Sequence, residues 1–292
     1  MKQRAYPALP AWRLKCSDAE YYADPFRKPT LTYSVAKRLV LECPAVAWLH
    51  HPRLGGESMS ATPAMRKGTL VDVLLFGGRE VEVIDADDWR GKAAREARDA
   101  AEAAGKVACL RKEHEVAQAT CESIRDGLKE FGLTMRGSKQ FSVAWWETAA
   151  DGQNVLCRGK LDNWDLSTLT IWDLKVRDQT RHSRLESHIA EMGYDIQGAA
   201  YTSAVSKLFP ELAGRVRFVD VFVEPHPKRS IVTPVELTAG SMGALGRARW
   251  QRGVDLWSRC MSERRWPGYV TEIQRAEAPA WAMNELYAGD AA

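Results

Sequence analysis

The sequence has 292 residues, of which 45% are apolar and 27% charged, as in an ordinary globular protein of one or two domains. This balance excludes a disordered chain, and no stretch approaches the ~18 consecutive apolar residues of a membrane-spanning helix. The net charge of +3 does not by itself indicate a nucleic-acid partner. The N-terminus has no apolar signal segment and the 6 cysteines form no CxxC pair, so we expect a cytoplasmic protein with free thiols.

The chain is predicted to begin with an irregular segment and a helix. Residues 1–30, rich in proline and aromatic residues, predict an irregular lead-in to a single domain over 31–292. Thr32 before an apolar run predicts a helix that ends at Pro44, and a polar loop follows to about Pro63.

Two further helical regions are predicted next. Apolar residues at helical spacing over Ala64–Phe76 predict a helix that a glycine pair ends. The proline-free segment 88–131 predicts two helices broken near Gly105, which we interpret as a helical insertion.

After Gly137 the pattern changes to short apolar runs between turn residues, which predicts strands. The predicted strands are 141–146, 155–159, 160–166, 169–176, 215–223 and 231–237. The predicted helices of this half cover about 187–209 and 241–263. This order indicates an α/β or α+β core with an N-terminal helical elaboration.

Charged residues recur within two of these apolar strands. If a hairpin turn lies at 167–168, Asp162 faces Asp173, and Lys175 shares the face of Asp173. Opposed carboxylates repel unless a cation lies between them, and Mg²⁺ prefers such oxygen ligands. A lysine two residues further on could orient or deprotonate a metal-bound water. A solvent-facing strand pair is the alternative, and the residues alone leave both open.

Gln197 and Tyr201 lie four residues apart in a predicted helix and so share one face. Both side chains can hydrogen-bond to a phosphate or to a water molecule. The alternative is a core-facing tyrosine with an incidental glutamine.

The ordered set Asp162, Asp173-Leu174-Lys175 and Gln197-x-x-x-Tyr201 resembles the PD-(D/E)xK nuclease pattern in its RecB-like form. More specifically, the chain resembles the RecE (exodeoxyribonuclease VIII) type nucleases of phages and prophages over about residues 30–270. The resemblance implies an α/β fold, a PD-(D/E)xK core in which helices flank a mixed central sheet.

The resemblance also implies an exodeoxyribonuclease that hydrolyses phosphodiesters with Mg²⁺, or with Mn²⁺ as an alternative. Asp162, Asp173 and the carbonyl of Leu174 would be metal ligands. Lys175 would orient the attacking water and stabilise charge on the phosphate. Gln197 and Tyr201 would shape the site and contact the DNA backbone.

Asp72 stands where the family usually has a histidine ligand. Aspartate is a hard-oxygen ligand for the same ions, so the exchange preserves metal binding in principle. It also leaves open a catalytically inactive remnant that binds DNA or a recombination partner. Gln140 and Glu147 lie near a position where the family often has an acid, and neither is counted as a ligand.

The resemblance implies 5′→3′ digestion of linear double-stranded DNA, which leaves 3′ single strands for a RecT-like annealing protein. It further implies a homo-oligomer without membrane contact, in the cytoplasm of a phage host. Another PD-(D/E)xK endonuclease or a single-strand nuclease remains as an alternative. A DNA path could be lined by basic residues of the insertion, although a solvated, charge-balanced face is the simpler interpretation. These residues are Arg90, Lys92, Arg95, Arg98, Lys106, Arg111 and Lys112.

Overall fold

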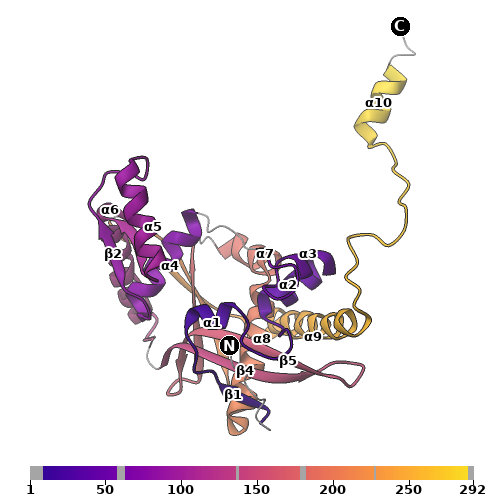
Figure 1. Cartoon of the computed structure of the whole chain (residues 1–292), viewed down its shortest axis with the longest axis horizontal. Coiled ribbons are helices and arrows are strands. Elements are labelled where there is room, and N and C mark those ends of the chain that lie inside the picture. Colours follow the sequence, from indigo (N-terminus) through magenta and orange to yellow (C-terminus); the bar gives the residue numbers. More distant parts are fainter. Residues whose placement is uncertain (1–8, 58–62, 136–137, 178–181, 227, 289–292) are drawn as a thin grey trace.

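A six-stranded mixed sheet forms the centre of the protein, in the order β1-β4-β5-β6-β7-β8 (Figure 1). The computed structural model describes residues 9–57, 63–135, 138–177, 182–226 and 228–288. Its central strands are β1 (Ala11–Arg13), β4 (Ser138–Thr148), β5 (Asn154–Asp165), β6 (Thr170–Val176), β7 (Arg217–Glu224) and β8 (Ile231–Glu236). Strands β6 and β7 pair in parallel, and the other neighbours in this sheet pair antiparallel.

Helices cover both faces of this sheet, which confirms the predicted α/β class with helices around a mixed sheet. The helices are α1 (Asp18–Tyr22), α2 (Tyr33–Leu41), α3 (Pro44–Leu49), α4 (Pro63–Phe76), α5 (Lys92–Ala103), α6 (Arg111–Glu130), α7 (His182–Met192), α8 (Tyr194–Leu208), α9 (Gly240–Glu263) and α10 (Ala280–Ala288). A single 3₁₀ turn, Pro210–Leu212, follows α8. Among the described residues no helix is both long and apolar enough to cross a membrane.

The two faces of the sheet bury different cores. On one face, Phe218 and Phe222 of β7 pack with α2, α8 and α9. On the other face, Val219 and Val221 pack with α4 and α6. Alternating residues of one apolar strand therefore supply both cores, as expected for a strand covered on both sides.

The N-terminal elements follow their local signals, with one addition. Thr32 caps α2 by accepting a hydrogen bond from the Val35 amide, as its position before the apolar run predicts. Helix α2 ends at Leu41, just before Pro44, and Pro44 occupies the first turn of α3. Proline suits this position because the first amides of a helix have no intrahelical partner. The described part of the loop predicted up to residue 63 therefore includes a short helix, α3.

The insertion is not purely helical. Its two helices are separated near Gly105, which adopts a φ of +77°, but β3 (Val107–Leu110) lies between them. This strand pairs in parallel with β2 (Val81–Ile84), so α5 is the crossover helix of a small βαβ unit. The prediction of helices alone was wrong because two four-residue strands carry too few residues for a period-2 signal.

Three other boundaries differ from the prediction. The strands predicted at 155–159 and 160–166 form one strand, β5. The helix predicted at 187–209 is two helices, since Gly193 adopts a left-handed φ of 67° between α7 and α8. Helix α10 was not predicted, and it lies apart from the sheet at the end of an extended segment (Figure 1).

The described part of the lead-in, residues 9–30, contains regular secondary structure and packs against the sheet. Strand β1 adds an edge to the sheet by pairing with β4, and α1 carries a capping box at Ser17 and Glu20. Tyr21 and Phe26 are buried in a small cluster against β4 and β5. Regular structure here depends on that docking, which a short segment cannot reveal by its own periodicity.

Candidate active site

The register of the β5–β6 hairpin places the two predicted carboxylates beside each other. Asn163 pairs with Trp172 and Asp165 pairs with Thr170, which is the predicted register. The turn is wider than two residues and covers 166–169. Beyond the last pair, the Leu174 amide donates to Asp162 Oδ2 at 3.1 Å. The backbone pairing of β5 with β6 therefore ends where Asp162 and Asp173 face each other. There the Asp162 carboxylate, instead of a backbone carbonyl, accepts the hydrogen bond of the Leu174 amide.

Asp173, Lys175 and Gln197 form a closed triangle of contacts. Lys175 Nζ forms an ion pair with Asp173 Oδ2 and donates to Gln197 Oε1 at 2.8 Å. Gln197 Nε2 donates to Asp173 Oδ1 at 2.5 Å. The ring of Tyr194 lies beneath the ammonium, 4.4 Å from Nζ to the ring centroid. Strand β6 and the first turns of α8 thus hold the lysine from several directions.

Tyr201 shapes the floor of the site rather than presenting a free hydroxyl. Its hydroxyl donates to the carbonyl of Lys160 at 3.0 Å, and its side chain is buried. The ring lies so close to β5 that a Cβ on Gly159 would come within 2.6 Å of it. A glycine at this position allows the helix to approach the strand. Lys160 itself donates to Asp18 Oδ1 of α1 at 2.7 Å, away from Lys175.

All the predicted site residues border one cavity of about 690 Å³. Its lining includes Asp72, Asp162, Asp173, Leu174, Lys175, Gln197 and Tyr201. Asp72 comes from helix α4 and the other six from β5, β6 and α8, so residues far apart in sequence meet here. Tyr33 also borders the cavity, and its ring packs edge-on against Tyr201 with centroids 5.6 Å apart.

Three of the carboxylates that border the cavity, those of Asp72, Asp162 and Asp173, influence one another. Burial, and then the carboxylates of Asp173 and Asp72, raise the pKa of Asp162 well above its ordinary value. Burial alone would lower the pKa of Lys175, but the carboxylates of Asp173 and Asp220 raise it well above its ordinary value. Lys175 is therefore protonated in this structure and acts as a hydrogen-bond donor.

The donor chemistry of the cavity fits a hard divalent cation. Asp72, Asp162, Asp173 and the Leu174 carbonyl offer oxygen atoms, which Mg²⁺ and Mn²⁺ prefer. A cation would also relieve the repulsion that raises the pKa of Asp162. Within the described ranges, no three His, Cys, Asp or Glu side chains are already arranged to hold a metal. Instead, Lys175 and Gln197 occupy both oxygens of Asp173.

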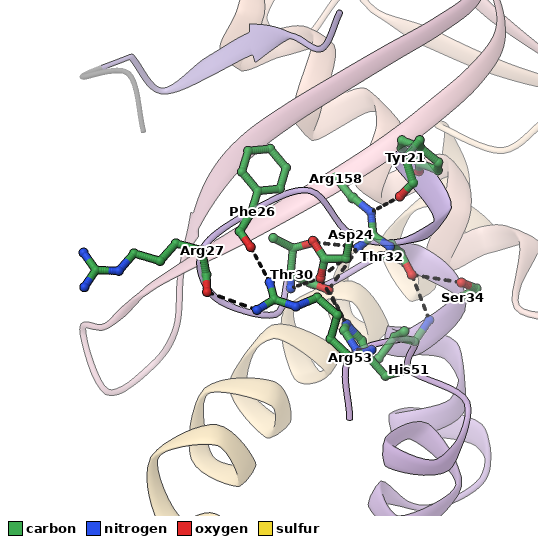
Figure 2. A network of polar contacts seen from close by, with 11 residues as sticks. Tyr21, Asp24, Phe26, Arg27, Thr30, Thr32, Ser34, His51, Arg53 and Arg158 are labelled. Atoms are coloured by element: carbon green, nitrogen blue, oxygen red, sulfur yellow. Dashed lines mark hydrogen bonds and ion pairs between the residues drawn. The ribbon is translucent and has the colours of Figure 1, made fainter. Parts of the chain in front are cut away.

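A hydrogen-bonded polar network, called here the wall network, includes Arg158, which borders the cavity (Figure 2). Arg158 of β5 donates to the Thr30 hydroxyl at 2.6 Å and pairs with Asp24 at 3.5 Å. Asp24 accepts from both the amide and the hydroxyl of Thr30, at 2.8 and 3.0 Å. His51 Nε2 lies 3.1 Å from the Thr30 carbonyl, and its Nδ1 accepts from the Arg53 amide at 3.2 Å. The network fixes the lead-in against the strand that carries Asp162.

Of the two residues considered near the preceding strand, Glu147 does not border the cavity. Glu147 is a core acceptor for the indole N–H groups of Trp145 and Trp250, at 2.8 and 3.0 Å. It also accepts from Ser203 at 2.6 Å and pairs with Lys207. The side chain of Gln140 lies outside the described residues.

Basic residues of the insertion are mostly balanced by neighbouring acids. Ion pairs join Lys92 to Glu96, Arg98 to Asp99, Arg90 to Asp88, Arg111 to Asp85, Lys112 to Asp87, and Lys106 to Glu80 and Glu82. This arrangement favours the solvated face over a DNA path.

Sequence reasoning missed one acidic residue of this region. Asp220 of β7 pairs directly with Asp173 of β6 and is 0% exposed. The sequence does contain an indication of this residue, since Asp220 lies in the middle of the apolar run Phe218–Val223. A buried charge in a central strand calls for a partner or a function.

Comparisons with known proteins agree with this fold. No curated protein matches the chain. A crystal structure of a protein from Eubacterium rectale, named provisionally as an exonuclease, superimposes with a TM-score of 0.59 at 14% identity. The match covers 94% of this chain and 99% of that one, and at this identity it shows a common fold. Residues 33–278 match the family described as PDDEXK-like domain of unknown function (DUF3799). The chain belongs to this PDDEXK-like family.

Proposed function

We propose that the protein is a metal-dependent exodeoxyribonuclease that digests linear double-stranded DNA from the 5′ end. The observation that carries this proposal is the convergence of Asp162, Asp173, Lys175 and Gln197 on one cavity. Membership in a PDDEXK-like family and the fold shared with a protein named provisionally as an exonuclease support it.

The proposed cation ligands are Asp162, Asp173, the Leu174 carbonyl and Asp72. A bound divalent cation would act as a Lewis acid on the phosphate and lower the pKa of water. The oxygen of the water forms a bond to phosphorus, the bond to the leaving oxygen breaks, and that oxygen gains a proton. Lys175, as an ammonium, donates a hydrogen bond to the water or to the phosphate oxygens. Gln197 holds Lys175 and Asp173 in place.

Further parts of the proposal come from the resemblance to RecE-type nucleases. They are the 3′ single-stranded product, its transfer to a RecT-like annealing protein in phage recombination, and a homo-oligomeric enzyme. An oligomer that encloses the DNA would keep it attached between cuts.

The test is a time course on linear duplex DNA labelled at the 5′ or the 3′ end, with Mg²⁺, Mn²⁺ or a chelator. We expect metal-dependent release of mononucleotides from the 5′ end, while a covalently closed circle stays intact. Cleavage of the circle would instead indicate an endonuclease. Absence of hydrolysis with either metal, from folded protein, would indicate an inactive remnant that binds DNA or a partner.

A further inference from the structure

Asp220 lies directly beside the candidate active site without bordering its cavity. It pairs in parallel register with Asp173, and Lys175 pairs with Phe222 on the same two strands. The side chains of paired residues in a parallel ladder point to one face of the sheet, so Asp220 points toward the face of Asp173. Among the described residues, neither carboxylate oxygen of Asp220 has a hydrogen-bond partner, and the residue is fully buried.

Packing alone does not account for an aspartate at this position. The neighbours of Asp220 on the same face, Phe218 and Phe222, are fully buried core residues. A buried carboxylate without hydrogen bonds is destabilising, whereas an apolar side chain would extend that core. Burial, and to a smaller extent Asp173, raise the pKa of Asp220 well above its ordinary value, while Lys175 lowers it.

Lys175 therefore has two carboxylates within its electrostatic reach. Asp173 contacts the ammonium directly, and Asp220 attracts it from the neighbouring strand. Only Asp173 also borders the cavity, so only Asp173 can serve a ligand there. Any cation on Asp173 would repel the ammonium and weaken that contact.

We propose that Asp220 is a positioning residue for Lys175: it is the second carboxylate that keeps the ammonium at the cavity floor when Asp173 binds a divalent cation. This inference rests on the proposed nuclease function. It assigns separate roles to two neighbouring acids. Asp173 borders the cavity and binds the cation, and Asp220 lies outside the cavity and attracts the Lys175 ammonium.

The first test compares kinetic constants of Asp220→Asn, which keeps the shape and removes the charge. We expect kcat to fall by about 10–100-fold, the usual effect of losing a residue that orients a catalytic group, with an unchanged KM for DNA. Asp220→Glu should recover part of kcat because it restores the carboxylate. The matched control is Asp195→Asn, another fully buried aspartate, which pairs with Arg249 and does not border the cavity. It should lower the melting temperature and leave kcat unchanged.

The second test does not depend on activity. Melting temperatures are measured in chelator for wild type, Asp220→Asn, Lys175→Met and the double variant, which form a double-mutant cycle. In the Lys175→Met protein the two carboxylates repel without an ammonium nearby, so adding Asp220→Asn should raise the melting temperature by about 2–4 °C. In the wild-type background the same substitution should raise it less, or lower it.

The two tests separate failure of the inference from failure of the proposed function. A wild-type protein that does not hydrolyse DNA refutes the nuclease, while the melting cycle still decides whether Asp220 and Lys175 are coupled. Equal shifts from Asp220→Asn in both backgrounds would overturn the positioning role. So would an Asp220→Asn enzyme with kcat within twofold of wild type.

Discussion

Strand β5 carries two buried charged clusters only four residues apart, and they differ in how their carboxylates are satisfied. Around Arg158, each oxygen of Asp24 has a hydrogen-bond donor, and an arginine and a histidine lie nearby. Around Asp162, the carboxylates of Asp72 and Asp173 also border the cavity, Lys175 contacts Asp173, and the neighbouring Asp220 has no hydrogen-bond donor among the described residues.

We propose that this difference separates a structural cluster from a functional one. A buried network in which every member is paired stabilises one arrangement of the chain. An excess of buried carboxylates destabilises the protein alone and leaves room for a cation to compensate. The wall network (Asp24, Thr30, His51, Arg53 and Arg158) should therefore matter for stability, and the cavity acids should matter for activity.

The largest expected effect is the loss of hydrolysis in Asp173→Asn. The substitution removes a proposed ligand and the ion-pair partner of Lys175, so the rate should fall by about 10³-fold or more. Circular dichroism should show an unchanged fold. The matched control is Asp165→Asn, a buried aspartate of the same hairpin that accepts from Ser167 in the turn. A near wild-type rate in Asp173→Asn would show that the site is assigned incorrectly.

The second effect is a loss of stability in Arg158→Met. Removing one partner of a buried pair leaves Asp24 uncompensated, which costs about 3–5 kcal/mol in the free energy of unfolding. Urea denaturation measures this loss. Arg217→Met breaks an exposed pair with Glu236 and should cost less than about 1 kcal/mol. Equal losses in the two variants would contradict the structural role of the wall network.

A smaller effect is expected for Asp72→His, which introduces the side chain usual at this position in RecE-type nucleases. If Asp72 is a ligand, histidine should bind the same cation, and activity should stay within about tenfold of wild type or rise. The ratio of rates with Mn²⁺ and Mg²⁺ should increase, because imidazole is a softer donor than a carboxylate. Complete inactivity of a folded Asp72→His protein would count against a ligand role.

Local pattern predicted the hairpin of the candidate site well, because antiparallel register follows from a turn and a period of two. The pairs Asn163–Trp172 and Asp165–Thr170 have the predicted register, and one step beyond them Asp162 faces Asp173. Asp220 could not be placed the same way, since the parallel pairing of β6 with β7 is made across α7 and α8. Spacing alone also does not show that Lys175 contacts a residue of α8. Its spacing to Tyr201 and the motif both single out Gln197, but its contact with Lys175 depends on how the helix packs.

The same limit explains the wall network. Asp24, His51 and Arg158 are far apart in sequence, and no spacing rule connects them. They meet because residues of the lead-in pack against β5, which depends on tertiary contacts. The sequence predicted the acids of the cavity through a family motif, whereas a network without a motif appears only in the fold.

The smallest expected effect is a dependence of stability on pH from His51. Burial lowers its pKa below the ordinary value, although the Thr30 carbonyl and Asp24 oppose this shift. Its hydrogen bonds fix the neutral form, because Nδ1 accepts from the Arg53 amide and a proton there would abolish that bond. The unfolded chain therefore binds a proton more readily than the folded one. The contribution of His51 to stability is complete above its unfolded pKa of about 6.5 and declines as the pH falls through that value.

Urea denaturation of wild type and His51→Gln at several pH values between about 5 and 8 measures this contribution. Other titrating groups, among them His188, whose pKa burial also lowers, affect both proteins equally and cancel in the difference. The stability advantage of wild type over His51→Gln should shrink as the pH is lowered. A difference that is constant with pH, or that grows in acid, would mean that His51 is charged in the folded protein. The wall network would then hold two cations around Asp24 rather than one, and its contrast with the cavity would be larger than the structure indicates.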